Sequence, residues 1–164
     1  MFPSIKKLKE DSDPSAPRFW YNEWVEKNAK GKVLDVGKSR FWSYGFPTLD
    51  KNKRLKPTFV DDICDCNLRG SSYDMVLCNG MYECVDDQQK MVKEVCRLLK
   101  LGGTAIFGFV NENYYSYKKG RKHYTEGDIK FPVKIIKTKL FNNYVFLICR
   151  KRSEEHTSEL QSLS

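Results

Sequence analysis

The sequence lacks any apolar run long enough to cross a membrane. A helix that spans a bilayer needs about 20 predominantly apolar residues in succession, and the 164-residue chain contains no such run. Its first residues, MFPSIKKLKEDSD, carry lysines but no apolar stretch behind them, a pattern that argues against a secretory signal. We therefore expect an intracellular, cytoplasmic protein with no membrane span.

Paired cysteine motifs are also missing. The cysteines stand at positions 64, 66, 78, 84, 96 and 149, and none of them forms the CxxC pair that is typical of zinc sites. In a chain without an export signal, such cysteines are expected as reduced thiols. Cys78, Cys96 and Cys149 lie in apolar patterns and are predicted to fill the core. No metal site is predicted.

The chain divides into three parts by composition. Residues 1–17 are charged and contain three prolines, so we expect a loose arm. Residues 18–151 carry the apolar periodicity of one domain, which suits the length and the 40% hydrophobic content. Residues 152–164, RSEEHTSELQSLS, resemble the translation of a sequencing-adapter oligonucleotide and are interpreted as non-native. The alternative is a natural disordered tail. In either case, the sequence does not determine the true C-terminus after Lys151.

The hydrophobic pattern predicts alternating strands and helices. We expect helices over 18–30 and 86–100, and strands over 32–37, 48–50, 58–63, 73–79, 104–110, 133–140 and 144–150. Strands joined by crossovers form parallel sheets, and the last two strands, with Phe141-Asn142-Asn143 between them, read as a hairpin. The fold class is therefore α/β: a Rossmann-like, doubly wound, mostly parallel sheet with a C-terminal antiparallel hairpin.

Polar residues follow several of the predicted strands directly. They are Asp35–Arg40, Asp50, Asp61–Asp62 and Asn79–Glu83. Ligands of open α/β sheets bind at the carboxyl ends of the strands, so these segments are where a binding site is expected. A nicotinamide dinucleotide is disfavoured, because GxGxxG is absent.

Five blocks, in order, resemble the class I S-adenosylmethionine-dependent methyltransferases. They are VLDVG (33–37), TLDKN with Asp50, DDICD (61–65), SYDMVLCNGMYECVDD (72–87) and VCRLLKLGGTAIFG (95–108). With the closing hairpin, the resemblance covers roughly residues 18 to 151. It implies S-adenosylmethionine as the cofactor and methyl transfer as the reaction.

The resemblance also implies roles for individual acidic residues. Asp50 would accept hydrogen bonds from the ribose hydroxyls, and Asp62 would take the adenine amino group, with the adjacent Asp61 as the alternative. Each of these carboxylates could instead cap a turn, as aspartates in loops commonly do.

Four further positions match the pattern around the methionine moiety. Asp35 and Gly37 would form the turn beneath it, with Gly37 allowing close backbone approach. Asn79 would lie near the methyl group, and Glu83 matches a glutamate common after the fourth strand, with an ordinary surface carboxylate as the alternative. No catalytic residue is identified; His123 is a candidate base or a surface histidine.

The first loop departs from the family pattern. Lys38, Ser39 and Arg40 stand where two further small glycines are usual. Their side chains would crowd the cofactor pocket, or the loop would take another path with Gly45 as its turn. Two functions therefore stay open: methyl transfer to an unidentified acceptor, and a catalytically inactive methyltransferase-like binding or scaffold protein.

The acceptor is left open between a small molecule and another anionic substrate. The segment NENYYSYKKGRKHY (111–124) carries tyrosines and basic residues that suit an anionic partner or simply form a solvated face. Nucleic acid is an open but less favoured partner. The (Asp/Asn)-Pro-Pro-Tyr and Pro-Cys motifs of base-methylating enzymes are absent, which argues against methylation of DNA bases. The oligomeric state is not predicted.

Overall fold

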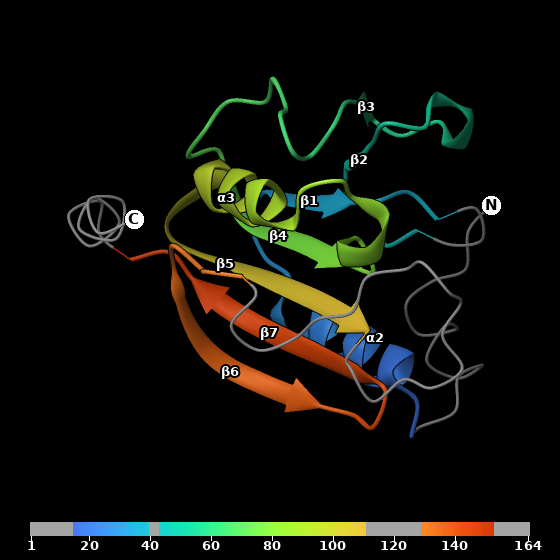
Figure 1. Ribbon diagram of the computed structural model, residues 1–164, viewed down its shortest axis with the longest axis vertical. Helices are drawn as coiled ribbons and strands as arrows, with labels where there is room; N and C mark the ends of the chain where they lie inside the picture. The colour runs from blue at the N-terminus through green and yellow to red at the C-terminus, as the bar shows by residue number, and fades with distance from the viewer. Residues whose placement is uncertain (1–14, 40–42, 111–128, 153–164) are drawn as a thin grey trace.

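A seven-stranded sheet forms the body of the protein in the computed structural model, which describes residues 15–39, 43–110 and 129–152. The strands are β1 (Val33–Val36), β2 (Thr48–Asp50), β3 (Phe59–Val60), β4 (Tyr73–Asn79), β5 (Leu99–Val110), β6 (Lys134–Leu140) and β7 (Tyr144–Arg150). The helices are α2 (Pro17–Asn28) and α3 (Gln88–Leu98), with the short 3-10 turns η1 (Lys53–Leu55) and η2 (Tyr82–Cys84). Figure 1 shows α3 on one face of the sheet and α2 behind the other.

The strand order is β3-β2-β1-β4-β5-β7-β6. The pairs from β3 to β5 are parallel, and β7 pairs antiparallel with both β5 and β6. The predicted doubly wound sheet and its antiparallel hairpin are confirmed. After β1 the chain extends the sheet on one side through β2 and β3, then crosses to the other side of β1 for β4. Such a reversal of direction is where open α/β sheets bind ligands.

The N-terminal helix α2 covers one face of the sheet through aromatic packing. Pro17 suits the first turn, because its missing N–H would have no helical partner there. Tyr21 and Val25 are buried against the sheet, and the Tyr21 ring stacks on Phe146 of β7 with centroids 5.4 Å apart. Trp20 packs beside the same phenylalanine at 5.0 Å. Trp20 and Tyr21 thus hold the helix on the sheet.

The helix α3 covers the opposite face and is strongly amphipathic. Asp87 caps its start, since its carboxylate accepts from the Lys90 N–H at 3.0 Å. The apolar residues in and directly after the helix are buried: Met91, Val92, Val95, Cys96, Leu98 and Leu99. The helix ends at Leu98 because Leu99 already belongs to β5. The predicted helix over 86–100 is therefore shorter at both ends.

The strands β3 and β5 differ most in length from the prediction. β5 starts at Leu99 rather than at residue 104, because Leu99 pairs with Tyr73 and Gly102 donates its N–H to the Lys151 carbonyl at 2.6 Å. β3 ends at Val60, since the carboxylate of Asp61 accepts from the Asp62 and Asn67 amides and turns the chain away. The longer β5 arises from pairing with residues far away in the sequence, and the shorter β3 arises from hydrogen bonds to a side chain. Local strand propensity explains neither difference.

The connection from β3 to β4 contains no α-helix, and side chains of α3 hold it in place. The Arg97 guanidinium donates to the carbonyls of Cys66 and Leu68 at 3.2 and 2.9 Å. Glu94 accepts from Arg97 at 2.8 Å and from the Cys66 N–H at 3.2 Å. One ion pair on α3 therefore anchors this crossover.

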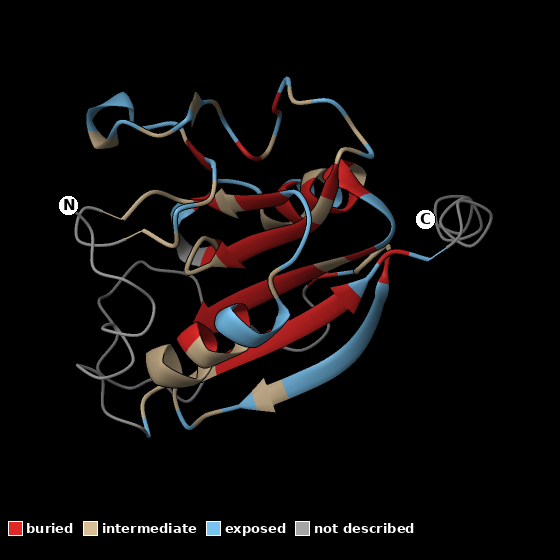
Figure 2. Ribbon diagram, turned by 180° about the vertical axis from the view of Figure 1, so that it is seen from behind, coloured by how far each residue is buried: buried red, intermediate tan, exposed pale blue. Residues whose placement is uncertain are grey.

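The strand β6 forms one edge of the sheet and is exposed along its length. Figure 2 shows it in pale blue beside the buried β7. The register alternates its side chains, with Lys134, Lys137 and Lys139 facing the side of α2 and Leu140 facing the side of α3. A register shift between Ile135 and Lys137 interrupts this alternation.

All six cysteines lie in the described part of the chain and none is in a disulfide. Cys78, Cys96 and Cys149 are buried, and burial raises the pKa of the Cys149 thiol to about 12. The predicted reduced core thiols are confirmed. Among the described residues, no helix has both the length and the apolar character needed to cross a bilayer.

Candidate functional site

A cavity of about 310 Å³ opens at the carboxyl ends of β1, β2 and β4. It lies where the strand order reverses, and residues of the segment after β1 and of α2 complete its wall. Four predicted site residues meet here: Asp35, Gly37, Asp50 and Asn79. Positions up to 44 residues apart in the sequence are thus brought to one edge of the sheet.

The turn after β1 requires glycine. Gly37 has φ +92°, a region that other residues adopt only at a cost. A Cβ at this position would lie 2.8 Å from the Met81 sulfur. Gly37 also donates its N–H to the Leu49 carbonyl at 2.7 Å. Gly37 therefore lets the turn after β1 lie close to the segment after β4. The close approach that this glycine permits is thus between two parts of the protein.

Asp50 binds the backbone of the loop opposite it. One carboxylate oxygen accepts from the Lys38 N–H at 2.9 Å, and the other accepts from the Asn52 N–H at 2.8 Å. Each carboxylate oxygen has two lone pairs, so both can accept a further hydrogen bond from a ligand. Asp50 is thereby held in a fixed orientation at the cavity wall.

Asp35 lies deeper in the cavity and holds its proton unusually tightly. Burial raises its pKa from the ordinary 3.8 to about 7, although the charges of Arg18 and Lys38 act to lower it. Near neutral pH this carboxyl therefore exists in both protonation states. A group with such a pKa responds strongly to any charge brought beside it.

Side chains from α2 close the other side of the cavity. The Tyr44 hydroxyl donates to the Asn22 side-chain oxygen, and burial raises the pKa of Tyr44 despite a hydrogen bond with Arg18. The Tyr21 hydroxyl is fully buried at the cavity and has no hydrogen-bond partner within the described structure. The Asn22 side-chain nitrogen is also buried and has no hydrogen-bond partner within the described structure. Buried polar atoms without partners are rare and costly, and often mark a place where a ligand or water binds.

Asn79 ends β4 and faces the cavity in a fixed orientation. Its side-chain oxygen accepts from the Tyr144 hydroxyl at 2.6 Å. The paired position on β5 is Gly108, and a Cβ there would collide with the Asn79 oxygen. Tyr144 and Gly108 thus determine where the Asn79 amide points.

The remaining predicted site residues lie elsewhere. Asp62 accepts from the Cys64 N–H at 2.9 Å within the turn after β3, and it does not line the described cavity. Asp61, the alternative, is engaged in the same turn. Glu83 belongs to η2, and its side chain is outside the described structure.

Several predicted features cannot be placed because they fall outside the described residues. They are Arg40, the segment 111–124 with His123, residues 1–14 of the arm and residues 153–164 of the tail. Lys38 and Ser39 are described and line the cavity, with the Lys38 ammonium donating to the Ser39 carbonyl at 3.2 Å. Within the described ranges, no group of acidic, histidine or cysteine side chains is placed to hold a metal ion.

The sequence analysis did not predict three residues that line the cavity from outside the strands. Arg18 and Tyr21 come from α2, and Tyr44 from the loop before β2. The rule that sites follow strand ends does not reach a helix N-terminal to the first strand. A signal was nevertheless available: Tyr21 and Asn22 place polar groups on the helix face that packs on the sheet.

Comparison with known proteins identifies the fold. Residues 45–107 match the family model described as a methyltransferase domain. The N-methyltransferase NodS from Bradyrhizobium japonicum, solved with S-adenosyl-L-homocysteine, is 10% identical with a TM-score of 0.64, and the match covers 91% of this chain and 97% of that one. A SAM-dependent methyltransferase from Thermotoga maritima is 15% identical with a TM-score of 0.56, covering 81% and 95%. Another from Methanosarcina mazei is 14% identical with a TM-score of 0.55, covering 78% and 97%. At these identities the structural likeness is one of fold.

Proposed function

We propose that this chain binds S-adenosylmethionine in the cavity at the carboxyl ends of β1, β2 and β4. Its resemblance to the class I S-adenosylmethionine-dependent methyltransferases is confirmed by the domain match and the fold. The observation that carries the proposal is the convergence of Asp35, Gly37, Asp50 and Asn79 on that one cavity. We further propose that the chain transfers the methyl group to an acceptor.

The residues present suit such a cofactor. The ligand carries a ribose diol, a cationic amino-acid end and a sulfonium, so carboxylates and polar groups are the partners it needs. Asp35 and Asp50 supply carboxylates, and the buried Tyr21 hydroxyl supplies a polar group with no partner in the described structure. The cavity volume, about 310 Å³, lies at the lower end of the usual range for ligand sites.

The geometry suggests a division of roles. Asp50 is fixed by two backbone amides with lone pairs directed outward for the ribose hydroxyls. Asp35 and Gly37 lie beneath the expected position of the methionine moiety, where a cationic amino group would favour the charged form of Asp35. Asn79, held by Tyr144, would lie beside the reacting methyl group.

Two predicted contacts remain proposals without a position in the cavity. Asp62 would reach the adenine amino group, with Asp61 as the alternative, from the turn after β3. Glu83 would act from η2. Substitution of each by alanine, read as a change in cofactor affinity, decides between ligand contact and turn formation.

Methyl transfer places modest demands on the protein. The cofactor supplies an activated methyl group on a sulfonium with a good leaving group. The chain must then align the acceptor with that methyl group and exclude water. A dedicated base is not always required for such a displacement. The acceptor class, a small or anionic molecule, therefore depends on groups around the cavity mouth.

Titration calorimetry with S-adenosylmethionine and S-adenosyl-L-homocysteine tests the proposal. We expect micromolar binding of at least one of them, weakened about tenfold or more in Asp50→Ala because hydrogen bonds to a charged group are lost. Asp65→Ala is the matched control, since Asp65 is an exposed aspartate in the neighbouring turn region and does not line the cavity. Absence of binding by a folded chain would contradict the proposal.

A second function is favoured by one observation. Lys38 and Ser39 line the cavity where the family has small residues. A methyltransferase-like binding protein without catalysis would explain side chains in that place. The same titration separates the two functions, because a scaffold would be folded and yet bind neither ligand.

We also propose that residues 18–151 form the native domain and that 152–164 is foreign to it. Chains ending at Lys151 and at Ser164 should then unfold at the same temperature and bind the cofactor equally. A lower unfolding temperature for the shorter chain would instead assign the tail a structural role.

A further inference from the structure

A second, larger groove lies away from the cofactor cavity. Its volume is about 950 Å³, and it runs between α2 and the strands β4 to β7. It includes the Gly102-Gly103 pair early in β5 and Asp74 at the start of β4, so it lies toward the amino ends of the parallel strands. The cofactor cavity is at their carboxyl ends. No residue lines both.

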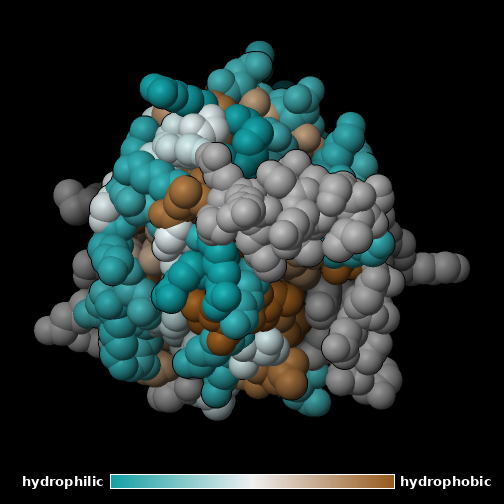
Figure 3. Space-filling model, turned by 90° about the vertical axis from the view of Figure 1, so that its left-hand side faces the viewer, coloured by the Kyte–Doolittle hydropathy of each residue, from teal (hydrophilic) through white to brown (hydrophobic). Residues whose placement is uncertain are grey.

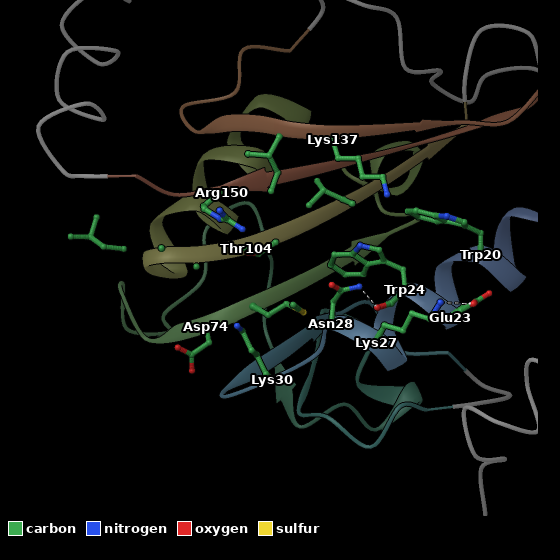
Figure 4. Close-up of a pocket in the computed structure, with 16 residues that line it drawn as sticks. Trp20, Glu23, Trp24, Lys27, Asn28, Lys30, Asp74, Thr104, Lys137 and Arg150 are labelled. Carbon is green, nitrogen blue, oxygen red and sulfur yellow. Dashed lines mark hydrogen bonds and ion pairs between the residues drawn. The ribbon is translucent and has the colours of Figure 1, made fainter.

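One wall of the groove is aromatic. Trp20 and Trp24 project from α2, both partly exposed (Figure 4). Trp20 is braced by Phe146 at 5.0 Å and by Phe141 at 6.4 Å, edge-on. An indole held in this way presents a fixed surface for stacking.

The opposite wall is basic. The register places Lys137 beside Ile148 and Lys134 beside Arg150, so these cations share the face that looks toward α2. Lys137 and Arg150 line the groove, as Figure 4 shows. The register shift before Lys137 adds Ile136 to the same wall, 39% exposed.

The groove carries a net positive charge. Its two acidic residues are matched by lysines: Glu23 pairs with Lys27 at 2.8 Å, and Asp74 with Lys100 at 3.5 Å. Three more cations line the groove beyond these pairs, namely Lys30, Lys137 and Arg150. The sign agrees with the formal net charge of +8 for the whole chain.

Apolar surface accompanies the cations. Leu101 is 54% exposed and lines the groove, as do the partly exposed tryptophans. Figure 3 shows hydrophobic atoms left uncovered between hydrophilic ones on one side of the molecule. A purely solvated basic face has no need of exposed indole and aliphatic side chains.

We propose that this groove binds single-stranded nucleic acid. Proteins that bind single strands combine a basic wall for the phosphates with aromatic side chains on which bases stack. Here Lys137, Arg150 and Lys30 provide the positive charge for the phosphates. Trp24 and Trp20 provide the aromatic surfaces on which bases stack. An acidic peptide without aromatic side chains would use the cations but has no planar ring for the indoles. The proposal does not depend on cofactor binding, because the two sites share no residue.

Fluorescence anisotropy with a labelled oligouridine of about 20 nucleotides tests this, since sites on such proteins span several nucleotides. We expect Lys137→Gln/Arg150→Gln to weaken binding by about tenfold or more and to reduce the log-log salt slope by about 1.4, because two phosphate contacts are lost. The matched control is Lys53→Gln/Arg54→Gln, which removes the same charges from the exposed turn η1. The control should bind like the unaltered chain.

A third variant separates stacking from charge alone. Trp24→Leu should weaken oligouridine binding about tenfold at unchanged salt slope, because base stacking and not a phosphate contact is lost. Circular dichroism confirms that each variant is folded. Equal losses in the η1 control, undiminished binding by Trp24→Leu, or equal competition by heparin or polyglutamate would each overturn the proposal. So would failure of the unaltered chain to bind oligouridine at low salt.

Discussion

The Tyr144 hydroxyl donates a hydrogen bond to the Asn79 side chain at 2.6 Å, linking β7 to β4 across the intervening strand β5. The link passes over Gly108, the residue of β5 that pairs with Asn79. A Cβ at Gly108 would collide with the Asn79 oxygen and lie 2.9 Å from the Tyr144 ring. The orientation of Asn79 therefore depends on the absence of a side chain at Gly108.

Gly108→Ala should lower the free energy of unfolding by about 1–3 kcal/mol, because overpacking displaces neighbouring side chains. It should also displace Asn79 and weaken binding of S-adenosyl-L-homocysteine. Denaturant unfolding and calorimetry measure the two effects. Tyr144→Phe is the companion variant: it removes the hydrogen bond without a collision, so we expect a loss near 1 kcal/mol. Equal stability of Gly108→Ala and the unaltered chain would contradict the collision.

Tyr21→Phe should leave the ligand-free protein as stable as before or more stable by about 1 kcal/mol, because an unpartnered buried hydroxyl is removed. The same change should weaken cofactor binding several-fold. Thermal unfolding with and without S-adenosylmethionine separates the two effects. Tyr44→Phe is the matched control, since its hydroxyl does have a partner in Asn22 and its loss should cost stability. Destabilisation by Tyr21→Phe would argue against an unpartnered hydroxyl.

Asp35 should make stability depend on pH between about 4 and about 7. Its pKa is near 3.8 when unfolded and about 7 when folded. Across this interval the unfolded chain releases the proton while the folded chain keeps it, so the stability that this group contributes falls as pH rises. The slope would be at most about 1.4 kcal/mol per pH unit.

Denaturant unfolding of the unaltered chain and of Asp35→Asn over this pH range isolates the contribution. The difference in the free energy of unfolding between the two proteins should change between about pH 4 and pH 7 and level off above about pH 7. The charges of Arg18 and Lys38 oppose the effect of burial and act to lower the pKa of Asp35. If a cationic cofactor binds beside Asp35, its affinity should rise with pH up to about 7, and this rise should vanish in Asp35→Asn.

Arg97→Ala should destabilise the fold by about 2 kcal/mol or more, because two loop carbonyls and Glu94 lose a charged donor together. Hydrogen exchange should show the largest loss of protection in residues 61–72. Lys93→Ala on the same helix is the control, since Lys93 is an exposed lysine. Uniform loss of protection over the whole sheet would instead assign Arg97 a global role.

The sequence predicted the sheet well because its central strands, such as β1, β4 and β7, are largely buried and stand out as apolar runs. The bounds of β2 and β4 agree with the prediction, and the parallel order follows from the crossovers. The early start of β5 could not be read locally, since glycines at 102 and 103 resemble a helix terminus. Only the pairing with Lys151, 49 positions away from Gly102, makes that segment extended.

The candidate site was predicted in part for a similar reason. Asp35, Asp50 and Asn79 lie at or near the ends of strands and Gly37 directly follows β1. Strand ends of a parallel sheet converge. Arg18, Tyr21 and Tyr44 enter the cavity from outside the strands, through the packing of α2 against the sheet. That packing depends on aromatic side chains of β7 far along the chain. The polar groups of Tyr21 and Asn22 on the buried helix face were therefore the one local signal, and they do not indicate which strands the helix packs on.

The exposed edge of the sheet has a consequence for self-association. An unpaired strand offers its N–H and C=O groups to any other strand, and natural proteins discourage such growth with charged side chains. β6 carries Lys134, Lys137 and Lys139 at this edge, and two copies aligned edge to edge would bring these charges together. The other edge, β3, is two residues long. The lysines therefore act as gatekeepers against amyloid-like stacking, and their repulsion would weaken as salt concentration rises.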